Sequence, residues 1–351
     1  MVKHTLISLS LAAIGAASPL LAQDTVNLIF SHPNMAPGEE VFMYAVPEKM
    51  GYFADEGITV NMQAASGGAQ AAQIVMSGEG DLSTTMAEAV LQLREQGADL
   101  TAIYELKRNN GFAVGIPAGS DISSLEDLVG KTIGVPVAGG GLAMIIDESF
   151  RKAGLEPTYT PVVIGSGAPA AAAIENGRVD AAVLWDAAFG VVENQGVEFK
   201  YLDLGVQDEL AGMSLVASQD FITENRDLAL AYCRAMTKGL VFTLANKEAA
   251  IDIMFDVFPT TKPAGISEEE AVPAQVNILD KWLASALKNL PEGHGTGEID
   301  TARWTGTAEK YVAAGILSSD ETEGAYDTSF FRECNDFDHE AIVTQADAYE
   351  G

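Results

Sequence analysis

Residues 131–154 read KTIGVPVAGGGLAMIIDESFRKAG. The β-branched run at 132–135 has the composition of a short strand, and the glycines at 139–141 are typical of a turn. Residues 142–153 then place apolar side chains at helical spacing. A strand, a turn and an amphipathic helix form the repeating unit of a parallel α/β fold, so this stretch predicts that fold class.

The same alternation continues on both sides of this stretch. Strands are expected at 26–31, 59–64, 82–85, 100–105, 112–116, 160–164 and 181–184. Helices are expected at 38–50, 69–78, 87–96, 168–176, 186–195 and 225–246, and a helix start at 121–126. Beyond about residue 205 helical patterns dominate. We therefore expect two α/β lobes, each with a mostly parallel sheet flanked by helices, followed by a helical C-terminal return.

The chain is strongly acidic. Its 351 residues include 50 Asp and Glu against 20 Lys and Arg, which gives a formal net charge of -30. Such a chain repels phosphate backbones and anionic lipids, and it has no Lys/Arg cluster, so we expect no nucleic-acid partner. Hydrophobic residues make up 48% of the sequence, which is typical of a globular protein and too many for a disordered one.

The N-terminus has the pattern of a secretory signal peptide. Lys3 and His4 form a short basic region, and an apolar run at 5–21 ends before the small residue Ala22. The alternative is a membrane anchor, but the run is short for a span and is interrupted by Gly15 and Pro19. We expect residues 1–22 to be removed near Ala22 and the mature protein to lie in the periplasm.

Export changes the interpretation of the two cysteines, Cys233 and Cys334. Oxidising compartments favour a disulfide, although sequence alone leaves open two buried thiols. The four histidines are scattered at positions 4, 32, 294 and 339, and no GxSxG or HExxH motif is present. We therefore expect no metal site, no cofactor and no enzyme activity.

Ligands of open α/β sheets bind where the strands end, so the residues after each strand are the candidate site. Three of these segments are glycine-rich turns before helices, which present free N–H groups to a polar ligand. The candidates are His32, Asn34, Met35, Ser66, Gly67, Gly68, Met86, Glu88, Lys107, Arg108, Gly139, Gly140, Gly141, Ser166, Trp185 and Asp186.

Several candidates have a purely structural alternative. The glycines and Glu88 suit the first turn of any helix, and Trp185, Met35 and Met86 could belong to the core. Lys107 and Arg108 could neutralise a carboxylate or sulfonate, or form a solvated pair. The turn at 165–170 formally matches a dinucleotide fingerprint, but an exported protein meets little of that cofactor, and Ser166 suits hydrogen bonding to a solute better.

Four motifs carry a resemblance to a known family. They are MGYFADEGITV at 50–60, SGEGDL at 77–82, LEDLVGKTIGV at 125–135 and ENGRVDAA at 175–182. In this order and spacing they resemble periplasmic substrate-binding proteins of ABC importers. The group resembled is the NMT1/THI5-like one, which handles nitrate, sulfonates, taurine and thiamine-pyrimidine precursors. The resemblance covers roughly residues 26–203.

The resemblance implies a type II two-lobe fold that closes on a solute and delivers it to an ABC permease with a cytoplasmic ATPase. Lobe I would comprise residues 24–110 plus 206–351, and lobe II residues 111–205. The expected solute is a sulfonate, an aromatic or other carboxylate, or a pyrimidine-like molecule, bound by a monomer. The alternatives are an enzyme like those that make the thiamine pyrimidine, whose cysteine-rich stretch is missing here, or an exported sensory module.

Overall fold

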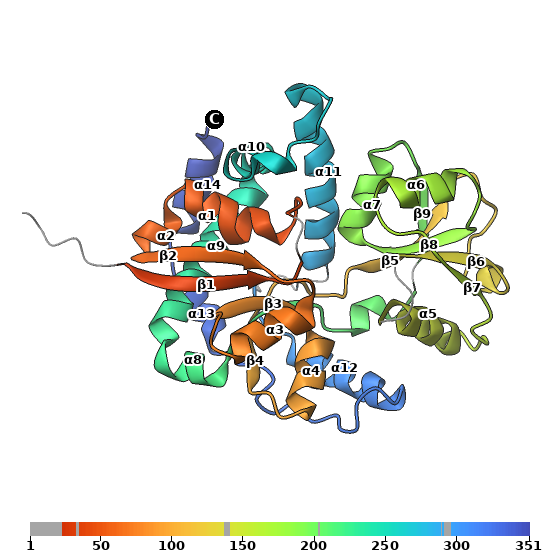
Figure 1. Cartoon of the computed structure of the whole chain (residues 1–351), viewed down its shortest axis with the longest axis horizontal. Coiled ribbons are helices and arrows are strands. Elements are labelled where there is room, and N and C mark those ends of the chain that lie inside the picture. Colours follow the sequence, from red (N-terminus) through yellow and green to blue (C-terminus); the bar gives the residue numbers. More distant parts are fainter. Residues whose placement is uncertain (1–22, 33–34, 137–140, 203, 289, 291–295) are drawn as a thin grey trace, which may run out of the picture.

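The computed structural model describes residues 23–32, 35–136, 141–202, 204–288, 290 and 296–351. They form two lobes, each built on a five-stranded sheet with helices on both faces (Figure 1). The predicted two-lobe α/β architecture is confirmed. Residues 1–22, with the predicted signal peptide, lie outside the described residues, as do Asn34, Gly139 and Gly140.

Each lobe has its own sheet. Sheet A of lobe I has the strand order β2 (Ile58–Ala64), β1 (Asp24–Phe30), β3 (Leu82–Met86), β10 (Met213–Ser218), β4 (Leu100–Glu105). Sheet B of lobe II has the order β7 (Thr160–Val163), β6 (Thr132–Val135), β8 (Ala181–Trp185), β5 (Phe112–Pro117), β9 (Phe199–Leu202). β9 and β10 have no counterpart among the expected strands.

In each sheet four strands run in one direction and one runs against them. β10 pairs antiparallel with β3 and β4, and β5 pairs antiparallel with β8 and β9, whereas the other pairs are parallel. Each reversed strand is the first that the chain forms after crossing from the other lobe. Its amino end lies next to the crossover. Because it runs antiparallel to its neighbours, the carboxyl ends of those neighbours lie next to the crossover as well.

Helices cover both sheets. In lobe I they are η1 (Val41–Ala45), α1 (Val46–Lys49), α2 (Tyr52–Asp55), α3 (Gly68–Met76), α4 (Ala87–Glu95), α8 (Gln219–Glu224), α9 (Arg226–Ala245), α10 (Lys247–Val257), η4 (Pro259–Thr261), α11 (Glu268–Ala286), α12 (Thr301–Ala313), α13 (Phe330–Cys334) and α14 (His339–Asp347). Between β5 and β10 they are η2 (Glu126–Leu128), α5 (Gly141–Lys152), α6 (Ala168–Glu175), α7 (Asp186–Glu193) and η3 (Gln207–Glu209). The helical C-terminal return is thus confirmed.

The largest core lies between sheet A and the helices around α9. Tyr232 of α9 stacks on Phe53 of α2, with ring centroids 5.9 Å apart. Within the described part of the chain, α9 alone is long and apolar enough to cross a membrane, but 67% of that stretch is buried. Its apolar surface is therefore explained by core packing.

The family-like motif at 50–60 serves the fold. Gly51 and Gly57 adopt φ values of 77° and 75°, which permit the two tight turns around α2. Tyr52 and Phe53 between them are buried, at 2% and 3% exposure. The motif thus fixes α2 between β2 and α9.

Two aspartates show that the lobes share one plan. The Asp81 carboxylate accepts the Asn27 backbone N–H at 2.6 Å, which ties the turn before β3 to β1. In lobe II the Asp180 carboxylate accepts the Thr132 backbone N–H at 2.8 Å and ties the turn before β8 to β6. Met86 and Trp185, which end β3 and β8, are therefore structurally equivalent positions.

The helix predicted to start at 121–126 is wrong. The Asp127 carboxylate accepts the backbone N–H groups of Ser123 and Ser124, at 2.9 and 3.1 Å, as a cap would. Only the single turn η2 (Glu126–Leu128) follows, because Gly130 turns the chain at φ 76° into β6. The sequence signal for a helix start is present, but the chain turns at Gly130 before a longer helix forms.

A disulfide connects Cys233 of α9 with Cys334 of α13. The sulfur atoms are 2.05 Å apart and the Cα atoms 5.2 Å apart, and both residues are fully buried. It fastens the C-terminal segment to the main core of lobe I.

Candidate functional site

The strand ends of both sheets meet near the two crossovers. Met86 and Trp185 end β3 and β8, and His32 follows β1 by two residues. Lys107 and Arg108 lie in the first crossover, between β4 and β5. These predicted side chains therefore follow the strand ends and the crossover, as the sequence analysis expected.

A buried ion pair joins the lobes at this junction. The Lys107 ammonium lies 2.5 Å from the Asp186 carboxylate, and 6% and 10% of these side chains are exposed. Lys107 Nζ also lies 4.8 Å above the ring centroid of Trp282 in α11. Gly111 adopts φ 70°, which favours glycine, and a Cβ there would meet Lys107 Nζ and Asp186 Oδ2 at 2.8 and 2.9 Å. Burial raises the pKa of Asp186, against the opposing charge of Lys107.

Arg108 is engaged in the same way. Its guanidinium lies 3.4 Å from the Glu105 carboxylate and 3.0 Å from the Asp300 carboxylate. Both cations of the crossover are therefore bound by carboxylates of the protein. The expectation that one of them neutralises an acidic solute gains no support from this geometry.

A second charged cluster follows β1. His32 Nε2 lies 3.0 Å from Glu39 Oε1, and His32 Nδ1 lies 3.5 Å from Glu40 Oε1. Glu39 and Glu40 are 3% and 1% exposed. Burial opposes ionisation of Glu39, but the His32 hydrogen bond lowers its pKa overall. Burial, helped by the charge of Glu39, raises the pKa of Glu40 to about 8.

The turn before α3 offers neutral polar groups. Gly67 precedes α3 and Gly68 begins it, and a Cβ on Gly68 would lie 2.7 Å from Thr85 Oγ1 of β3. That Thr85 hydroxyl is buried and has no hydrogen-bond partner in the described structure. Ser66 is exposed, and its hydroxyl and backbone N–H both donate to Gln70. The helix terminus and the Thr85 hydroxyl together suit a polar ligand group.

The remaining candidates are placed as follows. Trp185 is 38% exposed, so it is no core residue. Ser166 is exposed in a turn between two glycines with positive φ, before α6. Met35, Met86 and Glu88 are half-buried, and Gly141 begins α5.

Helix α11 connects the lobes a third time. Its Trp282 and Leu279 pack in the lobe I core, whereas Lys281 lies 2.8 Å from Glu193 of α7 in lobe II. Asn194 donates to the Ala274 carbonyl at 2.7 Å. A Cβ on Gly190 would lie 2.9 Å from the Ile278 Cα, so the two helices touch closely.

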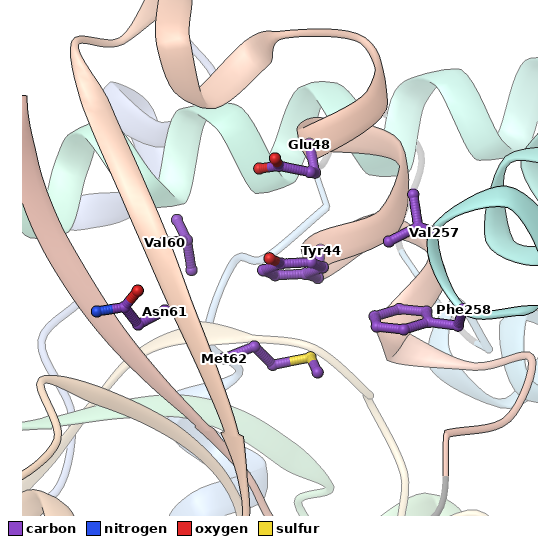
Figure 2. Close-up of a pocket in the computed structure, with 7 residues that line it drawn as sticks. All are labelled: Tyr44, Glu48, Val60, Asn61, Met62, Val257 and Phe258. Atoms are coloured by element: carbon purple, nitrogen blue, oxygen red, sulfur yellow. The ribbon is translucent and has the colours of Figure 1, made fainter. Parts of the chain in front are cut away.

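Two pockets bear on the location of the site. One of about 360 Å³ opens between the lobes and is lined by the first crossover, β5, β9, α11 and Asp186. Figure 2 shows the other, of about 500 Å³, where Val60 and Met62 of β2 face Tyr44, with Phe258 beside it. Every residue that lines this outer pocket belongs to lobe I.

Sequence reasoning missed Glu39, Glu40, Thr85 and Trp282. The acidic pair directly after Gly38 in PGEEVFMY, before an apolar run, was an ambiguous signal, because two acids at the start of a helix are also ordinary on a surface, where the helix dipole favours them. Trp282 gave no such signal, because its place on an apolar helix face is typical of core residues.

The carboxyl of Glu88 is expected to make the stability of the fold depend on pH. Burial raises its pKa from 4.5 to about 7. Since the folded-state pKa is raised, protonated Glu88 stabilises the fold fully below about pH 4.5, and that contribution is lost as pH rises through about 7. We expect Glu88→Gln to be more stable than wild type by about 2 kcal/mol at pH 8, and equal to it near pH 4.5.

Urea unfolding at several pH values measures this difference. Glu79→Gln, on an exposed turn, controls for the loss of one carboxylate. Parallel stability curves for Glu88→Gln and wild type across this pH range would contradict the prediction.

Comparison with known proteins gives one family and several relatives. A family model described as NMT1/THI5 like matches residues 40–250, more than half of the chain. The riboflavin-binding protein RibY of Chloroflexus aurantiacus is 28% identical over 312 residues, which cover 88% of this chain and 87% of RibY. The formylaminopyrimidine-binding protein of Halalkalibacterium halodurans is 26% identical over 325 residues, 87% of this chain and 92% of that protein.

Solved structures agree on the fold. The periplasmic aliphatic sulphonate binding protein SsuA of Escherichia coli superposes with a TM-score of 0.65 at 16% identity. The superposition covers 88% of this chain and 99% of SsuA. At that identity the likeness concerns the arrangement of helices and strands alone.

Proposed function

Since the chain belongs to the NMT1/THI5-like family, we propose that it is a receptor that captures a small organic solute between its two lobes. The observation that carries this proposal is the junction of the lobes, where strand ends of both sheets bring polar and aromatic side chains together. A solute that contacts both lobes favours the closed state, because only that state offers all contacts at once.

The geometry favours one of the expected solute classes, a planar pyrimidine-like heterocycle. The two cations of the crossover are paired with Asp186, Glu105 and Asp300, so no lysine or arginine there is left to neutralise a sulfonate. The exposed ring of Trp185 suits stacking on a flat ring, and Thr85 with the α3 terminus suits its polar edge. The two sequence relatives above are named for riboflavin and formylaminopyrimidine, both flat heterocycles.

The proposed binding residues come from both lobes. Lobe I, residues 24–110 plus 206–351, and lobe II, residues 111–205, would move about the crossovers. Because α11 is fastened to α7 as well, we propose that it bends or slides during closure. The proposed contacts are His32, Asn34, Met35, Ser66, Gly67, Gly68, Met86, Glu88, Gly139, Gly140, Gly141, Ser166 and Trp185, with Lys107, Arg108 and Asp186 shaping the junction.

The proposed setting is the periplasm, after removal of the N-terminal segment near Ala22. There the receptor, as a monomer, would deliver its solute to an ABC permease with a cytoplasmic ATPase. Both sequence relatives are named as binding proteins, which supports a receptor rather than an enzyme. The disulfide between Cys233 and Cys334 suits an oxidising compartment.

A thermal-shift screen of the mature protein tests the function. Pyrimidines, flavins, sulfonates, nitrate and aromatic carboxylates are the probes, since a ligand at 100 times its Kd stabilises by about 2.7 kcal/mol. We expect a shift with heterocycles. A folded protein that responds to none of these classes would contradict the proposal and favour a sensory or partner-binding role.

Trp185→Ala then locates the site. With the solute found in the screen, we expect binding at least tenfold weaker, about 1.4 kcal/mol, because the stacking surface is lost. The matched control is Tyr44→Ala in the outer pocket of Figure 2, which should leave the Kd unchanged. Titration calorimetry measures the Kd of each variant. Weaker binding in Tyr44→Ala together with an unchanged Kd in Trp185→Ala would indicate that the solute binds in the outer pocket.

A further inference from the structure

His32, Glu39 and Glu40 converge at the carboxyl end of β1. His32 leaves the strand, and the two glutamates open the helical segment that begins with η1 (Val41–Ala45). One ring nitrogen and one oxygen from each carboxylate all lie within 4.8 Å of one another. A segment of nine residues, 32–40, thus brings three donor atoms together.

The donor set is one that transition-metal cations use. An imidazole nitrogen with two carboxylate oxygens is a common protein contribution to zinc and manganese sites, which keep further positions for water or substrate. Bonds of about 2.0–2.2 Å from a tetrahedral cation place neighbouring donors about 3.3–3.6 Å apart. His32 Nε2 lies 3.0 Å from Glu39 Oε1, whereas Glu40 Oε1 lies 3.5 Å from the other ring nitrogen, Nδ1. With a single ring nitrogen as ligand, the three donor atoms lie within 4.8 Å of one another, so a small shift of one carboxylate brings them to that spacing.

Among the described residues, few positive charges lie near these two acids. Both carboxylates are almost fully buried, at 3% and 1% exposure, and buried carboxylates are normally paired with cations or bound to metals. In the described part of the chain, the cationic groups that face Glu39 are His32 and Lys107, and the Lys107 ammonium is held by Asp186 at 2.5 Å. Glu40 receives the Ala36 backbone N–H at 3.2 Å besides its contact with His32.

We infer that His32, Glu39 and Glu40 bind one divalent transition-metal cation, of the zinc or manganese class, on the lobe I side of the junction. The His32 side chain is 34% exposed while the carboxylates lie beneath it, so the cation is reachable from solvent on that side. The inference does not depend on which solute the receptor binds. It adds a metal to a site for which the sequence predicted none.

Metal titration of the mature protein tests the inference. Chelator-treated protein is titrated with Zn²⁺ and with Mn²⁺ by calorimetry at about 0.15 M salt, which screens weak attraction to the acidic surface. We expect one cation per chain and a raised Tm. His32→Gln and Glu40→Gln should each weaken binding roughly 100-fold, because each removes a ligand. His339→Gln, an exposed histidine of α14, is the matched control and should change nothing.

Three outcomes would overturn the inference. The first is a wild type that binds neither cation. The second is metal binding that survives both His32→Gln and Glu40→Gln in variants shown by circular dichroism to be folded. The third is that Glu40→Gln loses the binding of an organic amine and not of a metal, which would make the cluster an acidic solute subsite. The solute screen, run with and without chelator, judges the receptor function separately.

Discussion

Replacing Asp186 with asparagine is expected to lower the free energy of unfolding by about 3–5 kcal/mol, because the Lys107 charge then stays buried without its partner. The two groups are 2.5 Å apart and 6% and 10% exposed. Asparagine keeps the shape of the side chain and still accepts the Ala187 backbone N–H, which Asp186 holds at 2.7 Å. The loss therefore reports the contact with Lys107, which comprises the charge and the hydrogen bond that the second carboxylate oxygen accepts.

Urea unfolding of a double-mutant cycle measures this effect. Lys107→Met removes the stranded charge, so the double variant should be more stable than Asp186→Asn alone by about 2 kcal/mol or more. Asp99→Asn is the control, because its partner Arg94 lies 3.4 Å away and Asp99 is 60% exposed. That exposed pair should contribute less than about 1 kcal/mol. Additive effects of Lys107→Met and Asp186→Asn would contradict the prediction.

The ion pair also shows why site chemistry is harder to predict than the fold. Lys107 and Asp186 were both named from sequence, since each follows a predicted strand, but as separate contacts to a solute. Nothing local indicates that they meet, because they are 79 residues apart and belong to different lobes. Their meeting depends on how the crossover brings β4 and β8 together, which is a property of the whole fold.

The sheets show the same division between local and long-range information. Strands such as β1 and β6 are followed by helices and carry β-branched residues, so local pattern identifies them. β10 carries the sequence MSLVAS, with one β-branched residue, in a region dominated by helical pattern. It becomes a strand because β3 and β4 hydrogen-bond to it on both sides. Tertiary pairing here overrides a weak local preference.

The acidic pair at Glu39 and Glu40 illustrates a third case. Two acids before a helix are ordinary on a surface, where the helix dipole favours them. The fold instead buries them, because Val41, Phe42 and Met43 directly after them enter the lobe I core. Burial turns a common capping pattern into a candidate site, and burial is what a single sequence does not reveal.

Removing the disulfide with Cys233→Ala and Cys334→Ala is expected to lower the free energy of unfolding by about 4 kcal/mol. The bridge closes a loop with a sequence separation of 101, and cross-links of that span restrict the unfolded chain most strongly. Apart from the bridge, Phe330 of α13 is buried in the lobe I core, and Arg226 lies 2.9 Å from Glu333 and 4.1 Å from the Phe330 ring centroid. Alanine is chosen over serine because two serines would bury two hydroxyl groups in the core.

Urea unfolding with and without reductant distinguishes the effect of the covalent bond from the effect of removing the packed sulfur atoms. Wild type should lose nearly the same stability on reduction, while the double variant should be insensitive to reductant. Without the bridge, we also expect proteolysis to begin in the C-terminal segment, because α13 and α14 are then held on α9 by non-covalent packing alone. Two titratable thiols in denatured protein purified from an oxidising compartment, or a double variant within about 1 kcal/mol of wild type, would contradict the prediction.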